Sequence, residues 1–243
     1  MLKNNHKRIC LWSGPRNIST TLMYSFAQRP DTQVYDEPLY GHYLRTTEAR
    51  HYHPGAEEIM ASLEHDGRKV IEMMMGEHAK PVVFFKNMTH HLLDLDRDFM
   101  KDTVNIILTR DPSEMLPSFA KVIEMPTMED VGYALHIELL EYFRKHDIEH
   151  IILDAKKVLL DPGKLLKSVC EVIDIPFDKS MLAWKAGPRP EDGVWAKYWY
   201  GSLHKSTGFL KYKVKTEPFP DRLRPLLALC EPCYQELLEL SLG

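Results

Sequence analysis

The chain has 243 residues, of which 44% are hydrophobic and 27% charged, a composition typical of folded globular proteins. Its 31 Lys and Arg against 35 Asp and Glu give a formal charge of -4, which excludes a basic protein that coats long nucleic acid. No apolar run approaches the roughly 18 residues of a membrane span. Cys10 and Cys170 lie in apolar segments, as expected of buried thiols in a reducing compartment. We therefore expect one cytoplasmic domain over residues 1–243 with no nucleic-acid or membrane partner, and the oligomeric state stays open.

Short β-rich segments alternate with helical segments along the chain. The sequence predicts strands at 8–13, 33–35, 81–86, 104–109 and 150–153. It predicts helices at 19–28, 55–76, 92–100, 113–123, 128–146, 161–173 and 218–240. The segments 82–85 and 106–108 are apolar throughout, which is typical of parallel strands covered on both faces. This order predicts an α/β fold, a three-layer open parallel sheet with helices on both faces, in which ligands bind beyond the carboxyl ends of the strands.

The first predicted strand runs into a turn that suits an anion. A helix that opens from a tight loop presents free N–H groups and a positive dipole end, which is the chemistry that a phosphate needs. Here Ser19, Thr20 and Thr21 add hydroxyl groups, and Arg16 adds a permanent charge. The ordinary phosphate loop GxxxxGK[ST] is absent. A helix cap without a ligand is the alternative, because Ser and Thr favour N-caps in any helix.

A second cation follows the strand predicted at 104–109. Arg110 stands where a parallel strand delivers side chains to the ligand edge of the sheet, and Ser118 follows on the next helix. A guanidinium fork binds phosphate well, and a nearby hydroxyl can complete the coordination. The alternative is an arginine paired with Asp111 or with another carboxylate.

Together these motifs resemble the sulfotransferase family that uses 3′-phosphoadenosine 5′-phosphosulfate (PAPS). Residues 15–20 are similar to the family's 5′-phosphosulfate loop, P-[KR]-S-G-T-T, with Asn17 and Ile18 in place of Ser-Gly. The segment from Arg110 to Ser118 matches the 3′-phosphate signature R-[DN]-P-x-[DE]-x-x-x-S. Residues 160–177 resemble a later family helix, D-P-x-x-x-L…L-x-[LI]-P-[FW].

The resemblance covers roughly residues 8–180 and implies a P-loop sulfotransferase-like fold, PAPS as co-substrate and no metal. It implies that the donor is bound by Arg16, Asn17, Ser19, Thr20 and Thr21 at the phosphosulfate and by Arg110 and Ser118 at the 3′-phosphate.

Sulfuryl transfer, like phosphoryl transfer, needs positioning, charge stabilisation and a base for the acceptor. In several branches of the family a Glu-Pro after the second strand supplies the base, so Glu37 is the first candidate and Asp36 its close neighbour. The family also carries a lysine after the third strand that steadies the leaving oxygen, which implies this role for Lys86. His90 and His91 are alternative bases, although their spacing from Lys86 is longer than the K-x-H of cytosolic branches. A solvated turn at Glu37 is the alternative without a catalytic role.

The segment 187–212 is long and rich in Gly, Pro and aromatic residues, as expected of a lid or substrate loop. By resemblance to a late loop that closes over the nucleotide, Lys205 and Gly208 are its candidate donor contacts. An aromatic cluster that packs a C-terminal lobe is the alternative. Candidates for the wall of an apolar acceptor pocket are Trp195, Tyr198, Trp199 and Tyr200.

The sequence thus predicts a sulfotransferase that moves a sulfuryl group from PAPS to a hydroxyl or amine of a small-molecule acceptor. Two alternatives stay open: a P-loop nucleotide kinase or hydrolase, and a non-catalytic nucleotide sensor. The missing GK[ST] and the lack of an acidic Walker-B strand end count against the first. The identity of the acceptor is not predicted.

Overall fold

The computed structural model describes residues 6–243. Within this range, five parallel strands form one sheet in the order β2-β3-β1-β4-β5. The strands are β1 (Lys7–Ser13), β2 (Thr32–Asp36), β3 (Val82–Met88), β4 (Val104–Thr109) and β5 (His150–Asp154). The helices are α1 (Ser19–Phe26), α2 (Tyr40–Thr46), α3 (Ala56–Ser62), α4 (Gly67–Met75), α5 (Pro112–Phe119), α6 (Met128–Val131), α7 (Tyr133–Lys145), α8 (Ala155–Leu160), α9 (Pro162–Val172), α10 (Ala196–Trp199) and α11 (Arg224–Glu239).

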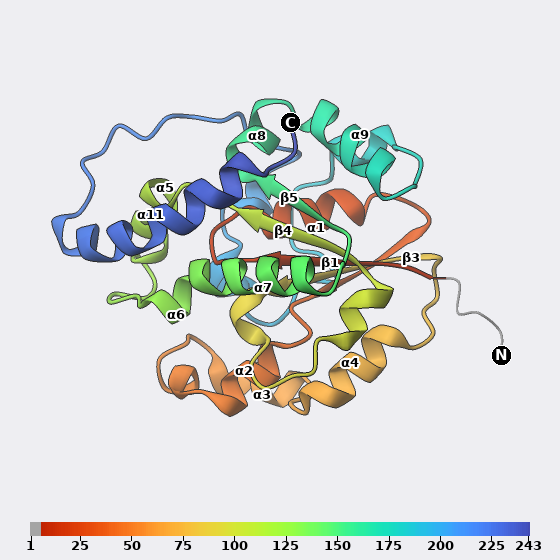
Figure 1. Cartoon of the computed structure of the whole chain (residues 1–243), viewed down its shortest axis with the longest axis horizontal. Coiled ribbons are helices and arrows are strands. Elements are labelled where there is room, and N and C mark those ends of the chain that lie inside the picture. Colours follow the sequence, from red (N-terminus) through yellow and green to blue (C-terminus); the bar gives the residue numbers. More distant parts are fainter. Residues whose placement is uncertain (1–5) are drawn as a thin grey trace.

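Each face of the sheet carries its own hydrophobic core. Side chains alternate along a strand, so Ile9 and Leu11 of β1 pack with α1 and α9, whereas Cys10 and Trp12 pack on the opposite face with α4 and α7. Figure 1 shows α8 and α9 on one side of the sheet and α4 and α7 on the other. The prediction of a parallel sheet with helices on both faces is therefore confirmed.

Two predicted helices are each divided in the structure. The segment 55–76 forms α3 and α4, because the chain is extended at Leu63 and Asp66 caps a new helix by accepting a hydrogen bond from the N–H of Arg68. The segment 128–146 forms α6 and α7, which meet at Gly132 with φ 75°. A left-handed residue ends one helix and lets the next begin at a new angle.

The helix predicted at 92–100 is wrong, because the structure has short 3-10 turns at Thr89–His91 and Asp98–Asp102 there. Asp94 adopts φ 52°, and the Asp96 carboxylate accepts a hydrogen bond from the N–H of Asp98. Aspartate side chains that bond nearby backbone groups compete with a helix, and they outweigh the helical spacing of the apolar residues here.

The late segment 187–212 is packed against the body of the protein. Trp195 and Tyr200 are buried in one cluster with Tyr40 and Tyr43 of α2. The Tyr24 hydroxyl of α1 donates to the Asp192 carboxylate at 2.7 Å, and Ala183 pairs with Gly208 in an isolated bridge. The segment therefore forms one wall of the molecule beside α1 and α2, and its role as a lid stays a prediction.

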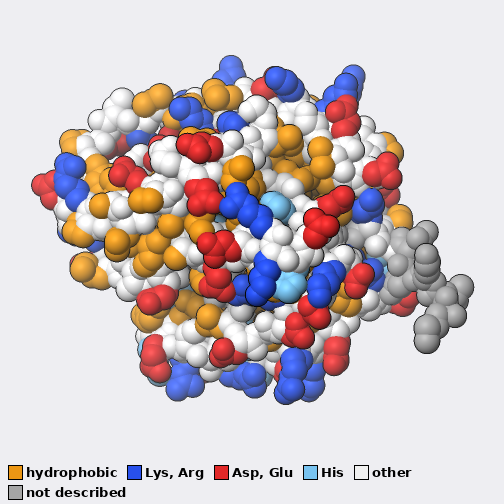
Figure 2. Space-filling view, in the orientation of Figure 1, with side chains coloured by type: hydrophobic (Ala, Val, Ile, Leu, Met, Phe, Trp, Pro, Cys, Tyr) orange, Lys and Arg blue, Asp and Glu red, His pale blue; other side chains and the backbone are white. Residues whose placement is uncertain are grey.

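The outer surface is mixed in charge. Figure 2 shows Lys and Arg interspersed with Asp and Glu over the face that it presents, without a continuous basic patch there. Within residues 6–243, no helix combines the length and the apolarity that crossing a bilayer requires.

Candidate active site

A cavity of about 710 Å³ lies at the carboxyl ends of the strands, between the sheet and the late segment. The predicted site residues that line it are Arg16, Asn17, Ser19, Thr20, Thr21, Glu37, Lys86, His90, His91, Arg110, Ser118 and Gly208. Lys205 is exposed and does not belong to the lining, so the structure does not bring this predicted donor contact to the site. The carboxyl ends of β1 to β4 thus deliver the predicted donor-binding and catalytic side chains to one space.

The loop before α1 has an unusual backbone. Arg16 and Ile18 adopt positive φ angles of 57° and 62°, and α1 begins at Ser19 without a side-chain cap. A β-branched residue with positive φ is a genuine outlier, and such strain is typically kept at functional sites. Ile18 therefore holds the left-handed conformation that the glycine of the family loop adopts readily. The uncapped N–H groups at the start of α1 leave donors for an anion.

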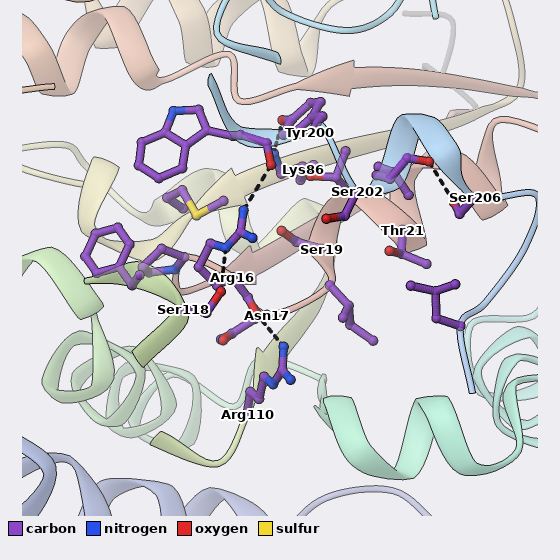
Figure 3. A pocket seen from close by; sticks show the side chains of 18 of the residues that line it. Arg16, Asn17, Ser19, Thr21, Lys86, Arg110, Ser118, Tyr200, Ser202 and Ser206 are labelled. Atoms are coloured by element: carbon purple, nitrogen blue, oxygen red, sulfur yellow. Dashed lines mark hydrogen bonds between the residues drawn. The ribbon is translucent and has the colours of Figure 1, made fainter. Parts of the chain in front are cut away.

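Arg16 is a partly buried cation without a carboxylate partner. Its Nε donates to the Ser118 Oγ at 3.1 Å and its Nη1 to the Trp199 carbonyl oxygen at 2.9 Å (Figure 3). Both acceptors are neutral, and no carboxylate of the described residues lies within ion-pair distance of it. Burial lowers the pKa of Arg16, and the charge of Arg110 lowers it further. Three of the five guanidinium N–H groups have no partner among the described residues, which suits an anionic ligand.

Arg110 has a carboxylate partner, as the alternative interpretation expected, but this partner is Glu114. Its Nη2 lies 3.1 Å from the Glu114 Oε2, and its Nη1 donates to the Arg16 carbonyl oxygen at 2.9 Å. Asp111 instead caps α5 by accepting a hydrogen bond from the N–H of Ser113. The Ser118 hydroxyl bonds Arg16 rather than Arg110. The two arginines and Ser118 therefore form one connected group at the cavity wall.

A buried charge cluster occupies the ends of β2 and β3. Asp36 and Lys86 are neighbours in the register of the two strands. The Lys86 Nζ donates to the Asp36 Oδ1 at 2.8 Å, the Glu37 Oε1 at 2.5 Å and the Tyr200 Oη at 2.6 Å. All three ammonium donors are thus engaged. Glu37 lines the cavity and Asp36 does not, so the two adjacent carboxylates differ in access to a ligand.

The cluster holds two carboxylates and one ammonium. Burial opposes the charge of Lys86, but the Asp36 and Glu37 carboxylates outweigh it and raise the pKa of Lys86 well above its usual range. Burial raises the pKa of Glu37 and the nearby Asp36 charge raises it further, while Lys86 opposes the rise. A carboxylate whose pKa is raised toward neutrality is better matched to proton transfer. Glu37 also has φ 43° and is, with Arg16 and Ile18, a third residue with a positive φ at this edge.

The two candidate histidines are buried and uncharged. Burial lowers the pKa of His90 to about 3 and that of His91 well below its usual range. The His91 ring is stacked against Tyr40 and Tyr43, with ring centroids 4.9 and 4.7 Å apart. A neutral imidazole with so low a pKa is a weak base. Both histidines line the cavity, where their rings form part of an aromatic wall next to Glu37.

Sequence reasoning missed several residues of this site. Lys211 and Lys213 line the cavity beside Tyr212, and the run Lys-Tyr-Lys, which begins within the late segment and ends one residue beyond it, is the available signal. The sequence predicts Tyr200 only as part of a pocket wall, whereas its hydroxyl accepts a hydrogen bond from the Lys86 Nζ, 114 residues away in the chain. No spacing rule in the sequence indicates that contact. Among residues 6–243, no group of three or more His, Cys, Asp and Glu side chains is arranged to hold a metal ion.

Comparison with solved structures indicates the fold. The chain is similar to a sulfotransferase domain of an olefin synthase from Synechococcus PCC 7002, with a TM-score of 0.55 and 13% identity over 94% of this chain and 96% of that chain. It is similar to a sulfotransferase from Alicyclobacillus acidocaldarius, with a TM-score of 0.54 and 12% identity over 97% of this chain and 95% of that chain.

Comparison of sequences extends this likeness. Two curated relatives from Arabidopsis thaliana, branched-chain-amino-acid aminotransferase-like proteins 2 and 1, are 40% and 39% identical over 228 residues. The match covers 93% of this chain and 40% of each relative, so the chain spans about two fifths of their length. The family model described as a sulfotransferase domain matches residues 7–238. The chain therefore belongs to the sulfotransferase domain family.

Proposed function

We propose that this sulfotransferase moves a sulfuryl group from PAPS to a hydroxyl or amine of a small-molecule acceptor. The observation that supports it most is Arg16, a partly buried guanidinium with two neutral partners and no carboxylate within ion-pair distance among the described residues. A buried cation is costly unless it is paired, so an anionic ligand at this position supplies the missing partner.

The donor loop and the two arginines fit the two ends of PAPS. In the proposed arrangement the uncapped start of α1, Arg16 and the hydroxyls of Ser19 and Thr20 hold the phosphosulfate. Arg110 and Ser118 hold the 3′-phosphate. Arg110 still has two N–H groups without a partner among the described residues after its bonds to Glu114 and the Arg16 carbonyl oxygen. Charge-assisted contacts with both arginines orient the donor along the edge of the sheet.

Glu37 is the proposed base. Its Oε1 is held by Lys86, whereas its Oε2 has no hydrogen bond to any described residue and the side chain lines the cavity. In the reaction this carboxylate takes the proton from the acceptor as the new bond to sulfur forms. The bond between sulfur and the bridging oxygen breaks, and the negative charge that develops on the leaving phosphate is held at Arg16 and the start of α1. His90 and His91 shape the acceptor wall and stay neutral.

The role proposed for Lys86 is electrostatic. Its ammonium holds Glu37 in place, and it reaches the leaving oxygen only by giving up one of its three bonds. We propose the cytoplasm as the location, because Cys10 and Cys170 are buried free thiols. The word aminotransferase in the names of the Arabidopsis relatives describes those longer proteins, of which the match covers 40%.

Calorimetric titration tests the donor. We expect 3′-phosphoadenosine 5′-phosphate to bind at least tenfold more tightly than 5′-AMP or ATP, without Mg²⁺. Arg110→Ala should abolish this preference, whereas Arg68→Ala, which removes an exposed arginine of α4, should leave it unchanged. Equal binding of the three nucleotides, or a requirement for Mg²⁺, contradicts PAPS as the donor and favours a kinase. Survival of the preference in Arg110→Ala contradicts the 3′-phosphate site.

A further inference from the structure

The hydroxyl of Tyr200 lies at the centre of a buried network. It accepts hydrogen bonds from the Lys86 Nζ at 2.6 Å and from the Trp195 Nε1 at 3.1 Å. It donates its own proton to Asp36, whose two oxygens lie 2.9 and 2.8 Å away. Every hydrogen-bonding position of this phenol is thereby engaged. One side chain of the late segment thus fixes both the ammonium and the carboxylate that stand beside Glu37.

The residue before Tyr200 contacts the donor loop. The Trp199 carbonyl oxygen, at the end of α10, accepts a hydrogen bond from the Arg16 Nη1 at 2.9 Å. Two adjacent residues therefore contact the two halves of the site: Trp199 contacts the donor cation Arg16, and Tyr200 contacts Lys86 and Asp36 beside the proposed base. Figure 3 shows Tyr200 beside Lys86, with Arg16 directed toward the same stretch of chain.

The chain just before Tyr200 is itself held in place. The N–H of Gly193 donates to the Asp36 Oδ2 at 3.2 Å, and the Asp192 carboxylate accepts from Tyr24 at 2.7 Å and contacts the His204 Nε2 at 3.0 Å. These contacts connect the late segment to α1 and to the end of β2. The position of Tyr200 therefore depends on the contacts that hold the late segment against α1 and the end of β2.

We propose that Tyr200 is a positioning residue for the base: its hydroxyl holds the Lys86 ammonium against Glu37, and the adjacent Trp199 carbonyl ties this arrangement to Arg16. The inference rests on the proposed function only in that Glu37 is called the base. Tyr200 acts through Lys86. The position of the Glu37 carboxylate therefore depends on how the late segment packs against the donor loop, which it contacts at Arg16.

The test is the titration of the Glu37 side chain, followed by carbon-13 NMR with labelled glutamate and assigned with Glu37→Gln. The groups that face Glu37 are Asp36, Lys86, Tyr40 and Tyr200. Tyr200→Phe keeps the ring and removes the hydroxyl, so Lys86 loses one of its three anchors and is held less firmly against Glu37. We expect the pKa of Glu37 to rise by at least half a unit. An unchanged titration overturns the proposal.

Turnover provides the second readout. We expect Tyr200→Phe to lower kcat at least tenfold and to leave the Kd for 3′-phosphoadenosine 5′-phosphate within twofold. Trp195→Phe, which removes one donor to the same hydroxyl, should act in the same direction with a smaller effect. Tyr198→Phe is the matched control, because Tyr198 lies in α10 two residues before Tyr200 and is 40% exposed, and it should match the parent protein.

The outcomes separate the two claims. If the parent transfers sulfuryl groups and Tyr200→Phe behaves like Tyr198→Phe, the positioning role is wrong while the proposed function stands. If the parent transfers none, the proposed function is wrong, and the Glu37 titration still decides whether Tyr200 controls this carboxylate.

Discussion

The backbone conformation of Ile18 predicts that glycine stabilises the protein more than alanine at this position, the reverse of the usual order. With φ 62° and ψ 15°, Ile18 lies in the left-handed region, which costs an L-residue about 1–2 kcal/mol and glycine almost nothing. Glycine elsewhere is less favourable than alanine by roughly 0.5–1 kcal/mol because of its backbone entropy. Ile18→Gly and Ile18→Ala both remove the isoleucine side chain, so the packing loss cancels in their comparison. We therefore expect the glycine variant to be more stable than the alanine variant by about 1 kcal/mol.

Urea unfolding of the paired variants measures this difference. Lys167, an exposed residue of α9, supplies the control, where alanine should be more stable than glycine by about 1 kcal/mol. Ile18→Gly should also keep the affinity for 3′-phosphoadenosine 5′-phosphate, because the loop keeps its shape. If alanine is the more stable substitution at both positions, the left-handed conformation of the donor loop is refuted.

Two further predictions concern charge. Arg16→Ala should weaken the binding of 3′-phosphoadenosine 5′-phosphate by roughly 10- to 150-fold in calorimetry, because it removes a charge-assisted contact of about 1.5–3 kcal/mol. An effect no larger than that of Arg68→Ala contradicts the anion site. Burial lowers the pKa of His53 to about 4 and that of His90 to about 3, so the unfolded chain takes up their protons first as the pH falls. Stability should therefore fall as the pH drops below about 6.5, by up to about 1.4 kcal/mol per pH unit for each histidine. Urea midpoints between pH 7 and pH 5 should show a shallower fall for His90→Phe, and identical slopes contradict the neutral, buried state of His90.

The strands of the sheet were predictable because each is marked by a short apolar run within its own sequence. The strand expected at 104–109 has these bounds in the structure, and the apolar segment 82–85 lies within β3 with every residue buried. Side chains buried on both faces leave a continuous apolar run that is readable without any tertiary contact. The positions of Arg16, Glu37, Lys86 and Arg110 followed, because parallel strands place their carboxyl ends at one edge.

The helix boundaries were less predictable, because single backbone groups decide them. Gly132 with a positive φ separates α6 from α7 within one continuous apolar pattern. At 92–100 the Asp96 carboxylate accepts a hydrogen bond from the N–H of Asp98, and the apolar spacing alone does not indicate this competition with the helix. Hydrophobic periodicity indicates which face is buried, whereas caps and turns decide where a helix ends.

The partners of the site residues were the least predictable part. The sequence placed Arg110 with Ser118, but the structure pairs Ser118 with Arg16 and Arg110 with Glu114. The role of Tyr200 follows from the seating of a late segment on α1 and α2, a contact between residues more than a hundred positions apart. Such pairings are set by tertiary packing, and a single sequence carries no spacing signal for them.

The transfer of labelled sulfate from PAPS to a panel of small alcohols, phenols and amines is the decisive measurement of the proposed activity. We expect labelled product with the parent protein and at least a hundredfold less with Glu37→Gln, while both proteins bind 3′-phosphoadenosine 5′-phosphate equally well. Transfer of phosphate from labelled ATP in place of sulfate, or undiminished sulfate transfer by Glu37→Gln, would contradict it.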